Sequence, residues 1–151
     1  MLHDNDGRIA CAGGLGSISS LEVWGPPASG AWNAAWTWTQ LPAMSVGRYG
    51  SCGCVMNDGR FPILGGGSDG DYTASCETLM VDGDKYWHPL PPIHHARSYF
   101  ACAAVARCII VAGGHGTQSA EVYDEALDRW MQLPCEVPGN TYLAAMGSAL
   151  L

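Results

Sequence analysis

Short apolar runs separated by turn-forming residues recur along the chain, and this pattern favours short β-strands over long helices. Residues 61–64 and 108–112 form apolar runs that each end at a pair of glycines. Each is preceded by a run of small and apolar residues, 48–56 in one case and 97–105 in the other. The sequence Asn57-Asp58-Gly59 lies between the runs 48–56 and 61–64, and these residue types tolerate the positive φ angles of a tight turn. We therefore predict antiparallel strand pairs joined by tight turns.

One series of residues occurs three times in the same order: a diglycine, a glutamate and then Trp-x-x-Leu-Pro. The diglycines are 52 and 48 residues apart, a period that indicates a repeat architecture. Two copies carry an arginine six residues after the proline, whereas the third has an asparagine there. The repeated positions are Gly13, Gly14, Glu22 and Trp38; Gly65, Gly66, Glu77 and Trp87; and Gly113, Gly114, Glu121, Tyr123 and Trp130.

Each repeat contains two further predicted strands. Residues 78–81 and 120–123 read as a third strand, and Trp-x-x-Leu-Pro as a fourth that ends at the proline, which cannot donate to a strand ladder. Four short antiparallel strands in about 50 residues correspond to one blade of a β-propeller. We therefore predict an all-β fold of about three blades. The predicted units are a blade lacking its first strand (1–47), two complete blades (48–96 and 97–139), and a first or closure strand (140–151).

The repeated residues have physical roles that can be anticipated. Glycines permit a positive φ angle and a close approach of backbones. The tryptophan offers a large apolar face that could wedge between adjacent blades. The glutamate and the arginine could tie strands together through charge-assisted hydrogen bonds.

The pattern resembles that of the kelch-repeat β-propeller family over nearly the whole chain. The third copy, with Glu121 to Asp124 followed by Trp130 to Pro134, matches best. The first copy departs most, because Trp24-Gly25 replaces Tyr-Asp and residues 26–35 form an insert. The resemblance implies kelch-type blades of four-stranded antiparallel sheets.

Three blades are fewer than the roughly four to eight that close a propeller. Three explanations remain open: a partial sequence of a longer kelch protein, a homodimer that completes a six-bladed ring, or an open arc of three blades. We favour the partial sequence, because repeat arrays need capping at their ends.

Composition and charge narrow the expected partners. The net charge is −7 with seven Lys and Arg residues, so we expect no nucleic-acid partner. The chain has no apolar run of membrane-spanning length and no secretory signal pattern at its start, so we expect an intracellular, by default cytoplasmic, protein without a membrane partner. The seven cysteines mostly lie in apolar runs, and we predict that they pack as free thiols, including Cys52 and Cys54 on one face of a strand.

The loops between the second and third strands share a face with the connections between blades, and there we predict a binding surface. Its residues are Arg48, Asp69, Asp71, Tyr72, His94, His95, Arg97 and His115. The two arginines have a competing interpretation as structural positions of the repeat. The three histidines could hold zinc or copper, but solvated loop imidazoles explain them better. We predict no metal, no cofactor and no catalytic residue.

The family resemblance implies two classes of function. Kelch propellers often serve as recognition platforms, including substrate adaptors of ubiquitin ligases and actin-associated scaffolds. We therefore expect a protein–protein interaction module with a protein partner, either a substrate-recognition domain or a scaffold. The alternative is a fragment of a kelch-propeller enzyme of the copper-radical oxidase or sugar mutarotase type. The sequence lacks an identifiable catalytic set, which favours a role without enzyme activity.

Overall fold

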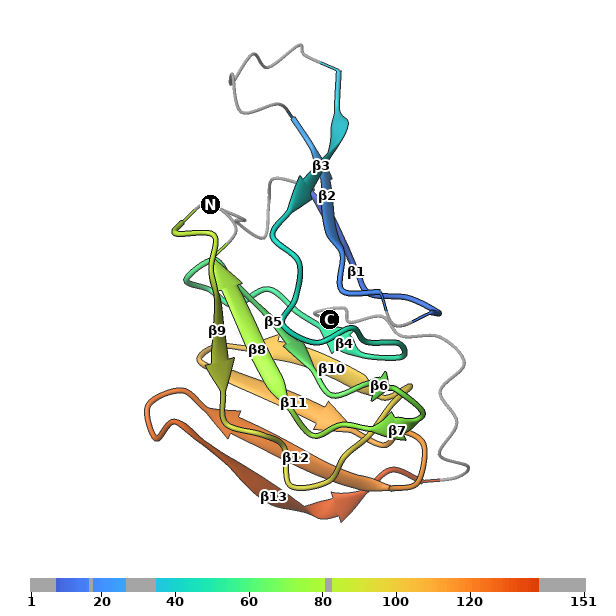
Figure 1. Ribbon diagram of the computed structural model, residues 1–151. Helices are drawn as coiled ribbons and strands as arrows, with labels where there is room; N and C mark the ends of the chain where they lie inside the picture. Colours follow the sequence, from blue (N-terminus) through green and yellow to red (C-terminus); the bar gives the residue numbers. More distant parts are fainter. Residues whose placement is uncertain (1–7, 17, 27–34, 81–82, 139–151) are drawn as a thin grey trace.

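The computed structural model describes residues 8–16, 18–26, 35–80 and 83–138, and within them every regular element is a β-strand. Three antiparallel sheets follow one another along the chain, and we call them blades 1, 2 and 3 (Figure 1). The prediction of an all-β fold built from consecutive antiparallel sheets is therefore confirmed. Blade 1 contains β1 (Ile9–Ala12), β2 (Leu21–Gly25) and β3 (Thr37–Leu41); blade 2 contains β4 (Cys52–Gly53), β5 (Arg60–Leu64), β8 (Cys76–Met80) and β9 (Trp87–Leu90); blade 3 contains β10 (Ala101–Val105), β11 (Cys108–Ala112), β12 (Ser119–Asp124) and β13 (Arg129–Glu136).

A small hairpin of β6 (Gly67–Ser68) and β7 (Asp71–Tyr72) projects from the β5–β8 connection of blade 2. The strands of blades 1, 2 and 3 lie inside the ranges 1–47, 48–96 and 97–139. The predicted strand at 140–151 lies outside the described residues. None of the described residues forms a helix that could span a membrane.

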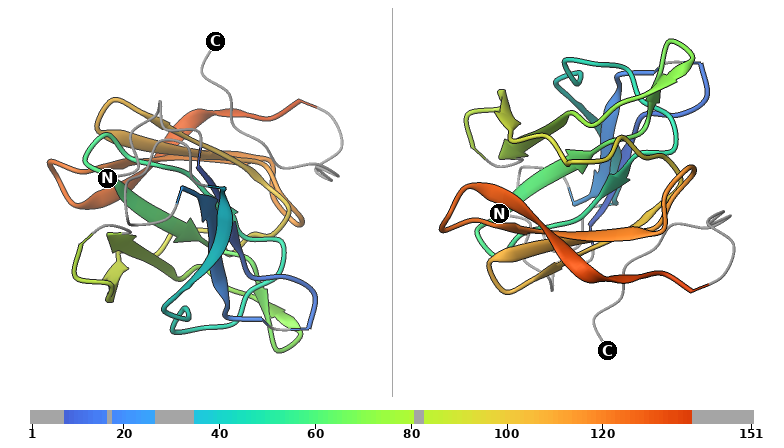
Figure 2. Two further views of the ribbon diagram at one scale, coloured as in Figure 1. Left: turned by 90° about the horizontal axis from the view of Figure 1, so that it is seen from above. Right: turned by 90° about the horizontal axis from the view of Figure 1, so that it is seen from below.

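The blades stack face to face, so that blade 2 lies between the other two (Figure 2). Strand alternation sends Phe61 and Ile63 towards blade 1, where they join a buried cluster with Leu21 and Val23. Leu64 points the other way, into a second cluster that blade 2 forms with blade 3. We call these two contacts the joint of blades 1 and 2 and the joint of blades 2 and 3.

Each joint is fixed by a tryptophan. Trp87 of blade 2 donates its indole N–H to the carbonyl of Pro42 of blade 1 at 2.9 Å, and Trp130 of blade 3 donates to Pro91 of blade 2 at 2.8 Å. The acceptor is in both cases the proline that follows the last strand of the preceding blade. This hydrogen bond gives the wedged tryptophan a fixed orientation as well as apolar contact.

The diglycines form a second contact between blades. Gly66 donates its backbone N–H to the carbonyl of Arg97 in the next blade at 2.8 Å, and Gly14 donates to Arg48 at 2.9 Å. Gly65 has a φ of 52°, and a Cβ there would lie 2.7 Å from the Arg97 carbonyl oxygen. Only glycine fits this close approach without a shift of the neighbouring backbone.

Three strands differ markedly in length from the prediction. The first strand of blade 3 was predicted over 97–105, but β10 begins at Ala101. A proline is involved in the other two cases. The first strand of blade 2 was predicted over 48–56, but β4 is only Cys52–Gly53. The Pro62 carbonyl faces Cys54, and because proline has no N–H to return, the ladder stops there. The last strand of blade 3 was predicted to end at Pro134, but β13 continues to Glu136. It is an edge strand with a register shift opposite Ser119 to Glu121, which accommodates the proline.

The cysteines also differ from the prediction. Cys54 and Cys76 are buried free thiols, but Cys52 and Cys102 form a disulfide between blade 2 and blade 3 with their Cα atoms 6.1 Å apart. Burial raises the pKa of Cys54 to about 12 and that of Cys76 to about 11, so neither is a ready nucleophile against the disulfide. Sequence spacing alone could not identify this pair, because its partners belong to different repeats.

Candidate functional site

A buried arginine closes the base of the loop between the second and third strands of each complete blade. In blade 3, Arg97 Nη1 donates to the carbonyl oxygens of Gly113 at 2.8 Å and Ser119 at 2.9 Å. Its Nη2 donates to Ser119 Oγ at 2.9 Å and to Glu121 Oε1 at 2.6 Å. These bonds join the two ends of the 114–118 loop.

Blade 2 repeats this arrangement. Arg48 Nη1 donates to the carbonyls of Gly65 at 2.8 Å and Ser75 at 2.9 Å, and Nη2 donates to Ser75 Oγ at 2.9 Å. Its ion pair with Glu77 is 3.2 Å long. We call this set of contacts the arginine clamp. Arg48 is 1% exposed and Arg97 is fully buried, so we no longer include them in the proposed binding surface.

Glu121 connects the clamp of blade 3 to the surface. Its carboxylate accepts the backbone N–H groups of His94 at 2.8 Å and His95 at 3.2 Å, and it contacts His94 Nδ1 at 2.9 Å. Burial alone would raise the pKa of Glu121, but the hydrogen bonds from the His94 backbone and from Arg97 outweigh it and lower the pKa. Burial conversely lowers the pKa of Arg97, and the bond to Glu121 opposes that change. Glu121 thus positions two histidines that remain half-exposed.

The remaining residues of the predicted surface lie at the same end of the blades. Asp69 and Asp71 are exposed in the β6–β7 hairpin, and Tyr72 is 39% exposed. The Tyr72 ring meets His115 of blade 3 edge-on, with ring centroids 4.9 Å apart. We call residues 67–72, 92–95 and 113–118 the loop face. The Tyr72–His115 contact joins its parts on blades 2 and 3 into one surface.

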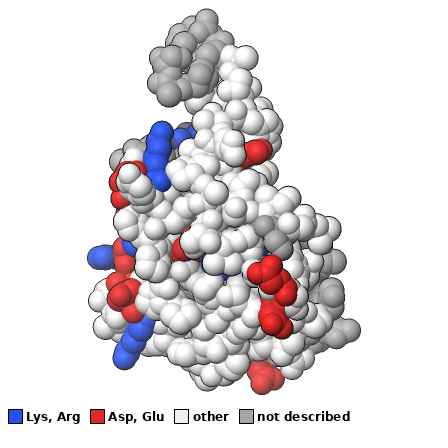
Figure 3. Space-filling model, in the orientation of Figure 1, with Lys and Arg blue, Asp and Glu red and all other residues white. Residues whose placement is uncertain are grey.

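The loop face carries no exposed lysine or arginine. The chain's five other basic residues all lie at the opposite ends of the strands, at Arg8, Arg60, Lys85, Arg107 and Arg129. In Figure 3 the prominent basic side chains lie along the left edge, while acidic groups without basic neighbours lie on the right. The exposed charges of the loop face are therefore acidic.

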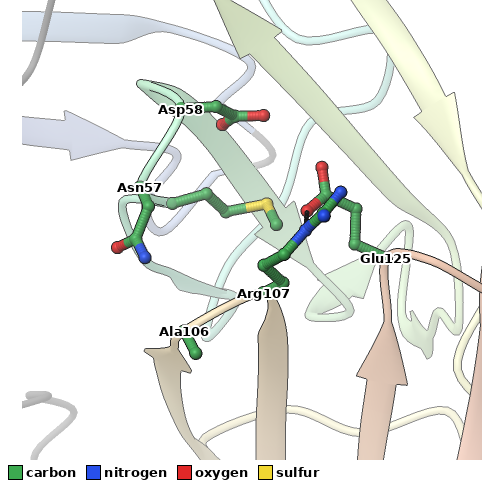
Figure 4. Close-up of a pocket in the computed structure, with 6 residues that line it drawn as sticks. Asn57, Asp58, Ala106, Arg107 and Glu125 are labelled. Carbon is green, nitrogen blue, oxygen red and sulfur yellow. Dashed lines mark hydrogen bonds and ion pairs between the residues drawn. The ribbon is translucent and has the colours of Figure 1, made fainter.

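A hollow of about 340 Å³ lies at the end of blades 2 and 3 away from the loop face (Figure 4). Met56, Asn57 and Asp58 line it from blade 2, and Arg107 and Glu125 from blade 3. Arg107 pairs with Glu125 at 3.1 Å, and Arg60 bridges Asp58 and Glu125. Because these charges compensate one another, the hollow is a weaker candidate for a ligand site than the loop face.

In the described part of the chain, no three His, Cys, Asp or Glu side chains are grouped closely enough to hold a metal ion. His94 and His95 contact Glu121, whereas His115 contacts Tyr72, so the three imidazoles that the sequence analysis considered have different neighbours.

Known proteins share this repeat. The kelch motif family matches residues 96–135. Among curated relatives, the F-box/kelch-repeat protein SKIP30 of Arabidopsis thaliana is 31% identical over 64% of this chain and 32% of its own length. The F-box/kelch-repeat protein SKIP20 of the same plant is 31% identical over 59% of this chain and 24% of its own length. Kelch-like protein 34 of Homo sapiens is 27% identical over 83% of this chain and 19% of its own length.

The chain thus spans a third or less of the length of these relatives. The residues that match the kelch motif, 96–135, contain one diglycine, the buried Arg97–Glu121 ion pair and Trp130 of the joint of blades 2 and 3. The three-fold repeat, the antiparallel blades and the kelch-motif match together show that this chain is a kelch-repeat protein.

Proposed function

We propose that the chain is a protein-interaction module that binds its partner through the loop face. The observation that carries this proposal is the contact of Tyr72 with His115, which unites loops of two blades on rigid bases. The arginine clamps hold the ends of these loops, while their tips remain exposed. Accessible loops on a rigid scaffold are a common arrangement for recognition.

The chemistry of the loop face favours a basic segment of the partner. Asp69 and Asp71 offer carboxylates, and Tyr72 offers an aromatic surface that can accept a cation. The net charge of −7 adds attraction at long range. A neutral or acidic segment would gain none of these contributions.

A finer proposal is that this surface selects a substrate for a ubiquitin ligase. Its support is the similarity to relatives that are named as F-box/kelch-repeat proteins. In such an arrangement the loop face would bind the substrate, and an adaptor segment would connect it to the ligase.

The test replaces Tyr72, His94, His95 and His115 with alanine and compares the proteins captured from an extract of the source organism. We expect at least a tenfold loss of the specifically bound partner, with the unfolding temperature preserved. The matched control replaces Lys85 and Arg107, which are exposed at the opposite end of the blades, and should retain the partner. Equal capture by the loop-face variant and the wild type would refute the proposal.

A further inference from the structure

Two tyrosines lie beside the loop face at positions that the repeats do not share. Tyr49 directly follows the clamp arginine of blade 2, whereas Tyr99 lies two residues after the clamp arginine of blade 3. Both side chains are half-buried, and their ring centroids are 6.5 Å apart with the rings tilted by 48°. Because the two tyrosines occupy different repeat positions, the common architecture of the blades does not explain them.

Tyr49 is attached to the β6–β7 hairpin. It donates its backbone N–H to the carbonyl of Gly67 at 3.0 Å and accepts the N–H of Gly67 at 2.7 Å. Gly67 is in turn paired with Tyr72 across the hairpin. Residues paired across neighbouring antiparallel strands project to the same side, so Tyr49 and Tyr72 flank Gly67 on one face.

Gly67 provides the space for the Tyr49 ring. The φ angle of Gly67 is not positive, so its backbone conformation does not require a glycine. A Cβ at this position would overlap the Tyr49 ring. The glycine therefore allows the ring to lie across the hairpin, in the row that ends with Tyr72.

Tyr99 has a strained backbone conformation. Its φ is 52°, and it is the only aromatic residue with a positive φ in the described part of the chain. The equivalent residue of blade 2 is Gly50, with a φ of 58°. This conformation costs a tyrosine energy that it does not cost a glycine. The ring lies over Gly50, since three of its atoms are 3.2 Å from where a Cβ of Gly50 would stand. Such strain is typical of residues whose side chains have a function.

His115 connects this region to the contact between blades 2 and 3. Its backbone N–H donates to the carbonyl of Ser98, the residue before Tyr99, at 2.8 Å. Its ring meets Tyr72 edge-on, as described above. We call Tyr49, Tyr72, Tyr99 and His115 the aromatic site. Tyr72 is exposed and the other three side chains are half-buried, so the site combines fixed rings with access from outside.

The charges around the aromatic site are negative. Asp69 and Asp71 are exposed in the hairpin that carries Tyr72. The hairpin turns tightly at Asp69 and Gly70, which both have positive φ angles, and this turn keeps the two carboxylates near the tyrosine. The clamp arginines precede Tyr49 and Tyr99 in the chain, but both are buried and paired with glutamates. Their positive charges are thus already compensated.

We propose that the aromatic site binds a lysine or arginine side chain of the partner. The ammonium or guanidinium group lies against the tyrosine rings, whose faces attract a cation. Asp69 and Asp71 add attraction between opposite charges. This inference rests on the proposed function and makes it more specific, because it names the chemical group that the loop face recognises in a basic segment.

The experiment measures binding of a fluorescein-labelled peptide of alternating lysine and glycine by fluorescence anisotropy. The same peptide with acetylated lysines lacks the cations, and we expect the full chain to bind it more weakly. Tyr49→Leu keeps an apolar side chain but removes the ring, and it should weaken binding of the lysine peptide about fivefold. The matched control is Tyr86→Leu, which removes a 71% exposed tyrosine from the β8–β9 turn and should bind as wild type.

Two further variants separate recognition from a purely structural role. Gly67→Ala retains every charge and every ring, but its Cβ displaces Tyr49, so we expect a loss of affinity like that of Tyr49→Leu. Tyr99→Gly introduces the residue that blade 2 has at this position. It should weaken binding about fivefold, while the unfolding temperature stays at or above that of wild type because the backbone strain is relieved. A tyrosine needed only for packing would lower the unfolding temperature instead.

Several outcomes would overturn the proposal. These are no binding of the lysine peptide by wild type, equal affinity for the acetylated peptide, and unchanged binding by Tyr99→Gly or Gly67→Ala. Partner capture distinguishes this failure from failure of the proposed function. If Tyr49→Leu and Tyr99→Gly retain the natural partner while the loop-face variant loses it, the loop face is still the binding surface and only the aromatic site is refuted.

Discussion

At the scale of single residues, Arg97 and Glu121 show how a polar pair can occupy the interior of a small β-protein. The guanidinium donates to three carbonyls, a hydroxyl and a carboxylate, so each of its three nitrogens has a hydrogen-bond partner. The carboxylate in turn accepts bonds from the His94 and His95 backbones. Complete hydrogen bonding offsets the cost of desolvating the two charges.

Removing Arg97 should therefore lower the stability of the folded chain. Arg97→Ala leaves the Glu121 carboxylate buried without its cation, and we expect the free energy of unfolding to fall by about 3–5 kcal/mol. Urea unfolding followed by tryptophan fluorescence measures this loss. Arg107→Ala is the control, because Arg107 is 74% exposed and its ion pair with Glu125 should contribute less than about 1 kcal/mol. Similar losses in the two variants would contradict a buried structural role for Arg97.

The sequence could identify Arg48 and Arg97 as repeated positions but could not decide between binding and structure. Repetition at a fixed distance from the proline is compatible with either role, since a ring of arginines could line a surface as well as a core. The burial of both arginines favours the structural role. Their burial depends on which strands surround each guanidinium in the folded chain. The loop residues Asp69, Tyr72 and His115 could be placed on one face because the strand order of a meander determines which loops share an end.

At the scale of elements, the inner strands β4 and β10 are connected covalently as well as by packing. The Cys52–Cys102 disulfide joins strands that are 50 residues apart in sequence and belong to neighbouring blades. The strand pattern indicated that both cysteines face a core, but it contained no information on register between blades. Pairing between repeats is set by how the sheets stack, and that is a property of the assembled fold.

The disulfide should contribute to stability only under oxidising conditions. Closing a loop of this length reduces the entropy of the unfolded chain, and we expect Cys102→Ala to lower the free energy of unfolding of the oxidised protein by about 2–5 kcal/mol. Dithiothreitol should remove most of the difference between wild type and variant. The control is Cys11→Ser, which changes an exposed free thiol and should behave as wild type in both conditions. A wild type that is indifferent to dithiothreitol would contradict this expectation.

At the scale of the whole molecule, stability should vary along the stack. Blade 2 is covered on both faces, whereas Ile9 and Trp38 are exposed on the face of blade 1 that points away from blade 2. Stacked repeats derive much of their stability from contacts with their neighbours. The number and order of blades followed from the repeat in the sequence, but the uneven cover of their faces required the structure.

Hydrogen exchange should report this gradient. We expect the amides of β1 and β3 to exchange at least tenfold faster than those of β5 and β8 in blade 2. The physical reason is that local opening of blade 1 breaks one joint, whereas opening of blade 2 breaks two. Mass spectrometry of peptides from each strand measures the rates. Uniform protection across the blades would show that the chain opens as a single cooperative unit instead.

The arginine clamp has a consequence for how such a chain can change. In blade 2 it fastens the ends of residues 66–74, and in blade 3 the same bonds fasten the ends of the shorter segment 114–118. The fastening therefore accommodates segments of unequal size, although both begin with the second glycine of the diglycine and carry a threonine two residues before the clamp serine. Because each clamp holds only the two ends of its loop, the residues between those ends can be replaced, by evolution or in the laboratory, while the strands of the blade stay unchanged.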